Sequence, residues 1–154
     1  MAIAVVRVRG KINIKPDIKK TLNLLNLTRA NHCVIIQENK YSKGMLQVVK
    51  DYVTWGEIET KTLSDLISKR GKLSGDREIT DKHIKTSTSF ENVGKLSEAI
   101  TKNKIKISEI PEFKPVFRLN PPKKGLKSVK RPFTKKGSLG YRGKEINALI
   151  EKMI

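Results

Sequence analysis

Near its start the chain reads Ala2-Ile3-Ala4-Val5-Val6-Arg7-Val8, an apolar stretch with a basic residue near its end. Its richness in Ile and Val predicts a first strand from Ile3 to Val8. Arg7 and Arg9 interrupt the apolar run, which is too short for a secretory signal, so we expect no targeting segment. No other run reaches the length of a membrane span, and no membrane association is expected.

A helix and a second strand are predicted to follow. Gly10 ends the first strand, residues 11–15 form a polar, basic loop, and Pro16 suits the first position of a helix. Apolar residues recur on one face of this helix, which should end near residues 25–27. They are Ile18, Leu22 and Leu25. The run Cys33-Val34-Ile35-Ile36 predicts the second strand, placed centrally in the sheet.

A second helix and a third strand complete the predicted core. Ser42 is a good N-cap for a helix that buries Leu46 and Val49, and a third strand with Trp55 as its largest anchor runs from Val53 to Ile58. Strand–helix–strand–helix–strand within sixty residues predicts a small α/β sandwich.

The middle of the chain is predicted to be helical. Thr62 and Asp65 resemble a capping box, Gly71 is a candidate C-cap, and Thr80 is a candidate cap for a short helix. A further helix is indicated by its apolar face. That face comprises Val93, Leu96 and Ile100.

The last part of the chain is predicted to be an irregular, basic extension. A short strand is expected from Val116 to Leu119 between prolines, and residues 123–143 are too poor in apolar residues to fold alone. We expect residues 123–142 to be mobile in the free protein. A final helix should return to the core through an apolar stripe. The stripe comprises Ile146, Leu149, Ile150 and Met153.

Charge divides the chain into three parts. The 154 residues carry 33 Lys and Arg against 15 Asp and Glu, a formal net charge of +18. Residues 1–50 hold ten basic and two acidic residues, residues 51–112 hold eleven of each, and residues 113–154 hold twelve and two. A surface tuned for solubility mixes its signs throughout, so the two ends are predicted to form a binding face for a polyanion. Charge alone leaves DNA, RNA and an anionic membrane open as that polyanion.

The residues that would carry chemistry are few. Cys33 is the single cysteine, which excludes an internal disulfide and a multi-cysteine zinc site, and it is expected to be a small buried hydrophobe. His32 and His83 stand apart in the sequence, so no metal site is predicted. No nucleophile motif or phosphate-cradling loop is present, and we expect neither an enzyme, nor a cofactor, nor a small-molecule substrate.

Several ordered motifs resemble those of a known family. The first part of the chain contributes Arg-Val-Arg-Gly (7–10), Leu-Thr-Arg-Ala-Asn-His (27–32), Lys-Gly-Met-Leu (43–46) and Asp-Tyr-Val-Thr-Trp-Gly (51–56). The last part contributes Val-Phe-Arg-Leu-Asn-Pro-Pro-Lys-Lys-Gly (116–125), Val-Lys-Arg-Pro-Phe (129–133), Gly-Ser-Leu-Gly-Tyr-Arg-Gly (137–143) and Ile-Asn-Ala-Leu-Ile-Glu-Lys-Met (146–153). Over essentially the whole chain, this set resembles the archaeal and eukaryotic form of large-subunit ribosomal protein thirty.

The resemblance implies a fold and a role. The fold is α/β: a β-α-β-α-β core with an antiparallel three-stranded sheet, similar to the ferredoxin-like arrangement, with a helical insertion and a basic C-terminal extension. The expected division is a core over 1–60, a neutral helical part over 61–112 and the extension over 113–154. The implied role is a structural constituent of the large ribosomal subunit in the cytoplasm, bound to its long ribosomal RNA and in contact with neighbouring ribosomal proteins. Lys123-Lys124-Gly125 stands where the family commonly has Arg-Gly-Gly, and Lys124 lacks glycine's freedom to adopt a positive φ.

The RNA contacts are predicted in the basic loops and the extension. In the core we expect two loops on one edge, one around residues 9–20 and one around residues 39–43, with Arg29 and His32 beside the second. The predicted RNA-binding residues are Arg7, Arg9, Lys11, Lys15, Lys19, Lys20, Arg29, His32, Asn39, Lys40, Tyr41, Lys43, Arg118, Asn120, Lys123, Lys124, Lys127, Lys130, Arg131, Lys135, Lys136, Tyr141 and Arg142. The alternative hypothesis is a free-standing nucleic-acid-binding protein, such as an RNA chaperone or a nucleoid protein, which a preformed extension would favour.

Overall fold

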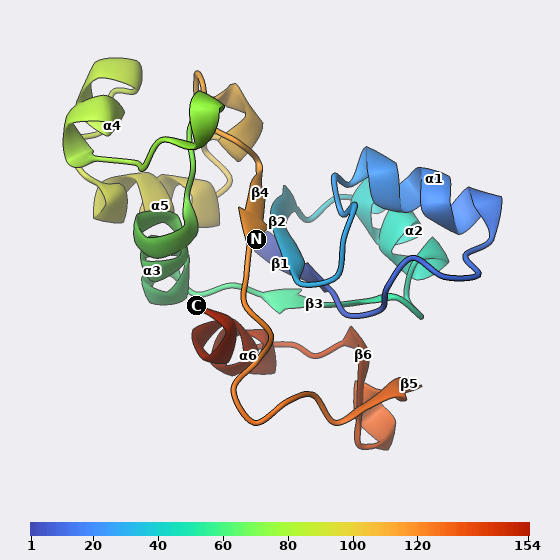
Figure 1. Cartoon of the computed structure of the whole chain (residues 1–154). Helices are drawn as coiled ribbons and strands as arrows, with labels where there is room; N and C mark the ends of the chain where they lie inside the picture. The colour runs from blue at the N-terminus through green and yellow to red at the C-terminus, as the bar shows by residue number, and fades with distance from the viewer.

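The computed structural model describes residues 1–154 as one mixed sheet with helices on both faces (Figure 1). The strands are β1 (Ala2–Arg7), β2 (His32–Gln37), β3 (Val53–Glu57), β4 (Val116–Arg118), β5 (Ser128–Pro132) and β6 (Gly137–Tyr141). The helices are α1 (Pro16–Leu24), α2 (Lys40–Val48), α3 (Thr60–Arg70), α4 (Asp81–Ser87), α5 (Val93–Thr101) and α6 (Glu145–Met153). No helix is both long and apolar enough to span a membrane.

Strand β1 is buried along its whole length and separates two hydrophobic clusters. Successive side chains of a strand point to opposite faces. Ile3 and Val5 therefore join the apolar residues of α1 and α2 on one face. Ala2, Ala4 and Val6 join those of α3, α5 and α6 on the other. The fold thus has three layers, and the first predicted strand lies in the middle one.

The α/β class is confirmed, but the prediction of a three-stranded antiparallel sheet is wrong. The sheet has six strands in the order β4-β2-β1-β3-β6-β5. Strands β2, β1 and β3 are antiparallel as expected, and β4 adds antiparallel to β2. On the other side β6 pairs parallel to β3, and β5 pairs parallel to β6. The extension supplies these last strands because β3 would otherwise leave an unpaired edge in the sheet.

Two predicted helix starts are displaced. Helix α2 is capped by Asn39, whose side-chain oxygen accepts a hydrogen bond from the backbone N–H of Ser42 (2.7 Å). The sequence suggested Ser42 because both residue types cap well, and only the chain path decides between them. Helix α3 begins at Thr60 without a side-chain cap, so the expected capping box at Thr62 and Asp65 does not form.

The basic extension contains more regular structure than its composition predicted. Strands β5 and β6 are joined by a 3-10 turn (Phe133–Lys135), and Leu139 of β6 is buried. All of β5 is exposed. The expected mobility of this segment before RNA binding stays a prediction. Helix α6 buries the four predicted apolar residues, as expected.

One hydrophobic cluster draws on all three predicted parts of the chain. It contains residues of the core strands such as Ala4, residues of the helical middle such as Leu66, and residues of α6 such as Ile150. The division at 60 and 112 therefore describes charge and composition, whereas packing joins the parts.

Gly56 should be intolerant of a side chain. A Cβ atom built on Gly56 would overlap the carbonyl oxygen of Gly143, where the extension crosses β3. We expect Gly56→Ala to lower the free energy of unfolding by about 1–3 kcal/mol, the usual cost of overpacking. Gly10→Ala is the control, because nothing lies within 4 Å of a Cβ there. Equal stability of the two variants in chemical denaturation would show that the crossing is looser than described.

Candidate nucleic-acid interface

The basic residues of the chain fall into a paired and an unpaired set. The ion pairs gather in the helical middle and its borders, where Glu78, Glu91, Glu98, Glu109 and Glu112 take basic partners. Among the predicted RNA-binding residues with a basic side chain, only Lys43 and Arg118 form an ion pair with an acid. The uncompensated charge is therefore concentrated in the predicted interface.

A first basic cluster lies where β1 ends and β2 begins, and we define it as Lys11, Arg29, His32 and Arg118. His32 and Arg118 are register partners on β2 and β4. Burial lowers the pKa of His32, and the positive charges of Arg118, Arg29, Arg7 and Lys11 lower it further. The imidazole is thus surrounded by cations, which is an arrangement suited to an anion.

The loop from Arg9 to Lys15 extends this cluster. The Arg9 guanidinium lies 4.9 Å from the centre of the Tyr52 ring and donates to the carbonyl oxygen of Asp51 (3.3 Å). Lys11 and Lys15 are exposed, and Ile12 between them is 87% exposed. Sequence analysis missed Ile12, although an apolar residue at the centre of a basic loop was a signal.

Arg7 has a structural role. It is 2% exposed, and its guanidinium donates to the carbonyl oxygens of Leu27 (2.6 Å), Gly10 (2.8 Å) and Arg9 (2.9 Å). Burial lowers its pKa. Because its donors hold the loops that carry Arg9 and Arg29, Arg7 positions the first cluster and is left out of the interface proposed below.

The second predicted loop lies at the other end of the sheet. Ala2 pairs with Gln37 and Val6 with Cys33, so the residues after β2 lie beside the start of β1, away from the first cluster. The expectation that both loops share one edge is therefore wrong. Arg29 and His32 lie with the first loop, because the chain returns to β2 at the end of β1 where Arg7 holds Leu27.

The start of α2 offers a different surface. Lys40 is exposed, Tyr41 is 84% exposed, and Lys43 is paired with Glu38 at 2.7 Å. Asn39 is occupied as the cap of α2. Lys40 and Tyr41 line a shallow hollow together with Thr21 of α1. Lys19 and Lys20 are exposed on α1.

The extension forms the third basic region. A groove between it and α6 is lined by Lys123, Lys124, Lys127, Arg142 and Lys152, with Glu145 as its only acid. The backbone N–H of Lys123 donates to the carbonyl oxygen of Lys152 (3.0 Å), and that of Asn120 to Met153 (3.0 Å). Sequence analysis missed Lys152, because a basic residue in the last turn of a helix is common at any C-terminus.

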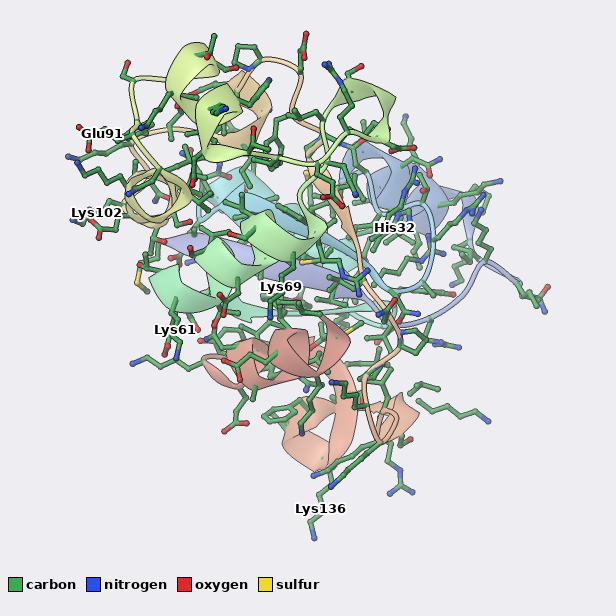
Figure 2. All side chains as sticks on the ribbon, turned by 60° about the vertical axis from the view of Figure 1, so that its left-hand side comes forward. His32, Lys61, Lys69, Glu91, Lys102 and Lys136 are labelled. Atoms are coloured by element: carbon green, nitrogen blue, oxygen red, sulfur yellow. The ribbon has the colours of Figure 1, made fainter.

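The outer part of the extension carries charge at the limit of the sheet. Lys130 and Arg131 lie on the exposed edge strand β5, and Lys135 and Lys136 follow in the turn. Figure 2 shows Lys136 at one extremity of the molecule, far from Glu91 and Lys102 of the helical middle. Lys124 and Lys136 adopt φ of 66° and 58°, so Lys124 takes the conformation that glycine would favour there.

Arg142 and Tyr141 attach the extension to the core. Arg142 donates to the hydroxyl of Thr54 (3.1 Å) and the carbonyl oxygen of Ser138 (3.1 Å), and it lies over the Phe133 ring. Burial lowers its pKa. The Tyr141 hydroxyl donates to Glu57 (2.6 Å), and this hydrogen bond raises the pKa of Tyr141. Both residues are partly committed within the protein.

The structure holds no group of three or more His, Cys, Asp and Glu side chains placed to bind a metal ion. Cys33 is fully buried, and burial raises the pKa of its thiol to about 12. It therefore packs as the expected small hydrophobe rather than serving as a thiolate ligand.

Comparison with known proteins finds close relatives. The family described as Ribosomal protein L30p/L7e matches residues 3–53. Three archaeal proteins named large ribosomal subunit protein uL30 are similar over nearly the whole chain. That of Methanosphaera stadtmanae is 47% identical over 98% of this chain and 99% of its own. That of Thermoplasma volcanium is 49% identical over 99% of this chain and 92% of its own. That of Archaeoglobus fulgidus is 45% identical over 97% of this chain and 98% of its own.

Arg7 and Arg9 should differ sharply in their effect on stability. Arg7→Ala removes the donors of three carbonyl oxygens, and an unsatisfied buried polar group costs about 1–3 kcal/mol. We expect a loss of that size or more in chemical denaturation. Arg9→Ala loses one long hydrogen bond and a half-exposed ring contact, so its loss should stay below about 1 kcal/mol. Similar losses would contradict the structural role of Arg7.

The pKa of His32 should report the field of the first cluster. In the isolated protein it should lie below the usual value near 6.5 and rise in Arg118→Ala or Arg29→Ala, since each variant removes a charge that disfavours the imidazolium. Arg77→Ala is the control, because Arg77 does not act on His32. NMR titration of the imidazole measures all three. An unchanged pKa in both cluster variants would show that these side chains do not surround His32.

Proposed function

The chain belongs to the family of large ribosomal subunit protein uL30, and on that premise we propose that it is a structural constituent of the large ribosomal subunit. It works without catalysis, in the cytoplasmic ribosome, as a protein bound to ribosomal RNA and next to other ribosomal proteins. The relatives' names support the assignment to the subunit, and the similarity extends over nearly the full length of both chains.

The observation that supports RNA binding is the scarcity of acidic partners around the basic residues at both ends of the chain, where Lys43, Lys114 and Arg118 are the ones in ion pairs. A net charge of +18 opposes the compact state through self-repulsion, and a polyanion removes that cost. Most of the acids that form ion pairs have their partners among the basic residues of the middle and leave the charge of the ends largely unneutralised. For a member of a ribosomal protein family, the polyanion at hand is ribosomal RNA.

We place the RNA contacts on three surfaces of the protein. They are the first cluster with the loop of Arg9, Lys11 and Lys15; the outer faces of α1 and of the start of α2 with Lys19, Lys20, Lys40, Tyr41 and Lys43; and the extension with Asn120, Lys123, Lys124, Lys127, Lys130, Arg131, Lys135 and Lys136. Lysines predominate on these surfaces, and a lysine offers a point charge rather than a planar fork. The contacts should therefore be made mainly to phosphates, which position the protein without reading sequence.

The extension is the surface most open to RNA. Every residue of β5 is exposed, and as an edge strand it presents unpaired backbone groups together with its basic side chains. The extension contributes strands to the sheet and is therefore partly preformed. This favours the alternative hypothesis of a free-standing nucleic-acid-binding protein. Full-length similarity to named ribosomal proteins weighs more, and we retain the ribosomal assignment.

Two paired substitutions separate RNA-binding charge from ordinary surface charge. The double variant Lys130→Ala/Arg131→Ala should bind deproteinised large-subunit RNA more weakly than the wild-type protein. The slope of log K against log salt should become shallower by roughly one to two units, because each phosphate contact contributes about 0.7–0.9 to it. The matched control is the double variant Lys95→Ala/Lys102→Ala, because both lysines form ion pairs on or beside α5. Filter binding at several salt concentrations measures both.

The control pair should leave the slope unchanged. Equal slopes for the wild-type protein and the Lys130/Arg131 variant would exclude β5 from the interface. A flat salt response of the wild-type protein would overturn RNA binding through charge altogether.

A further inference from the structure

The outer edge of β2 is only half covered by its neighbour. Strand β4 pairs with His32, Cys33 and Val34, and its pairing stops there. Ile35 would be opposite Pro115 in the same register, and proline has no N–H to donate. The last three residues of β2 therefore have a strand on one side only, which is β1.

The register identifies the free backbone groups. Glu38 donates its N–H to the carbonyl oxygen of Met1, on the β1 side. In an antiparallel pair the direction alternates from one residue to the next, so Ile35 and Gln37 face away from β1. No backbone carbonyl outside the sheet accepts from either N–H. The carbonyl oxygen of Gln37 accepts from the Ser42 hydroxyl (2.8 Å), which leaves two N–H groups and the carbonyl oxygen of Ile35 free.

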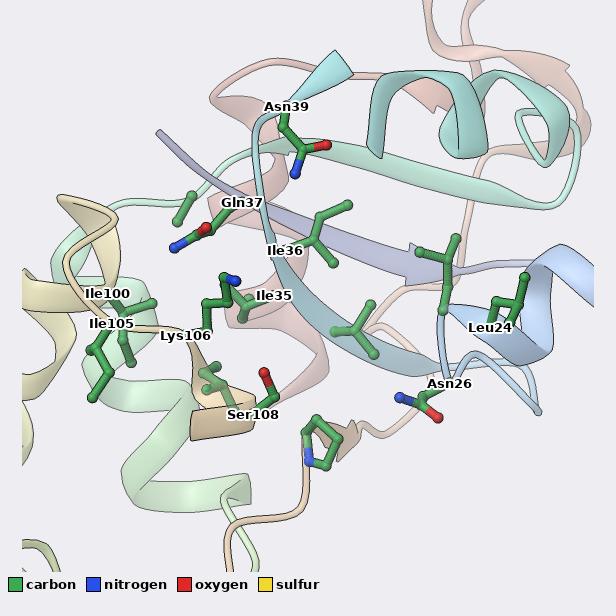
Figure 3. A pocket seen from close by; sticks show the side chains of 15 residues that line it. Leu24, Asn26, Ile35, Ile36, Gln37, Asn39, Ile100, Ile105, Lys106 and Ser108 are labelled. Atoms are coloured by element: carbon green, nitrogen blue, oxygen red, sulfur yellow. The ribbon is translucent and has the colours of Figure 1, made fainter. Parts of the chain in front are cut away.

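An apolar groove of about 250 Å³ runs along this free edge. Figure 3 shows Ile100 and Ile105 on one side of β2 and Leu24 on the other, with Ile35 and Ile36 between them. Nine of its fifteen lining residues are hydrophobic, and Lys106 is the only charged one. Unlike the basic groove at α6, this one offers almost nothing to a phosphate.

The shape and charge of the groove identify its occupant. A row of free N–H and C=O groups beside apolar side chains is the arrangement that an extended peptide completes by strand addition, with its alternate side chains in the pockets. Because Lys106 is the one charged residue in the lining, a polyanion gains little attraction inside the groove. These features favour a protein over RNA.

We propose that an extended segment of a neighbouring large-subunit protein, with apolar residues at alternate positions, adds as a short strand to β2 at Ile35–Gln37. This inference rests on the proposed ribosomal function and assigns a protein-binding site on the side of β2 opposite to β1. The segment accepts hydrogen bonds from the N–H groups of Ile35 and Gln37, donates one to Ile35, and places an apolar side chain against Leu24, Ile100 or Ile105.

Site-specific photocrosslinking in assembled large subunits tests the identity of the occupant. A benzophenone amino acid replaces Leu24, which is 67% exposed and can be changed without disturbing the core. We expect an adduct that protease destroys and ribonuclease leaves intact, with the crosslinked peptide alternating in apolar residues. A ribonuclease-sensitive adduct, or no adduct, would overturn the inference. The same probe at Lys130 should give an RNA adduct, so that failure of RNA binding is recognised separately.

A pair of substitutions at Gln37 tests the backbone contact. Gln37→Pro removes an N–H that is unpaired in the free protein, a change tolerated on an edge strand. Gln37→Ala removes the side chain and its hydrogen bond to Asn103 but keeps that N–H. We expect the crosslink yield from position 24 to fall roughly 2- to 10-fold in the proline variant, the worth of one hydrogen bond, and to stay unchanged in the alanine variant. Thermal unfolding confirms that both fold, and equal yields would exclude strand addition.

Discussion

Burial of β1 on both faces is the constraint on which the rest of this structure depends. It is the one strand with every residue buried. Its alternate side chains start two separate hydrophobic clusters, so helices are required on each side of the sheet. The first helices, α1 and α2, cover one face within the first fifty residues. The other face is covered by α3, α5 and α6. Because α6 lies at the far end of the chain, that end must return to the core.

Because the chain returns to the core, the basic extension is attached to the sheet and helices at several points. Helix α6 anchors it at one end and β4 at the other, while β6 adds to the free edge of β3. The core thereby holds a segment whose own composition is too polar to fold alone. Apart from Arg142, which has hydrogen-bond partners, its charged side chains remain largely outside, many of them on β5 and the adjoining turns, because a charge without a partner is costly to bury. The residues that attach the segment to the core thus differ from those that we propose as RNA contacts.

Arginine serves both purposes in this chain. Arg7 and Arg142 are partly or fully enclosed and donate to carbonyl or hydroxyl oxygens of other segments, so each connects loops that are distant in sequence. Arg29 and Arg118 are exposed and create a positive field that acts on His32. The guanidinium group suits either role, since it remains charged and presents several donors in a fixed geometry. Burial, rather than residue type, distinguishes the two.

Signals along the chain were enough to predict the β-α-β-α-β order, the apolar face of α6, the concentration of charge at the two ends and the resemblance to a ribosomal family. Each of these depends on local periodicity, on composition or on motifs readable along the chain. Other features became known from the folded structure alone: the six strands of the sheet, the enclosure of Arg7, the capping of α2 by Asn39 rather than Ser42, and the position of the two core loops at opposite ends. These outcomes depend on pairing between residues far apart in sequence, where strand register and competing hydrogen-bond partners determine which of several locally acceptable arrangements forms.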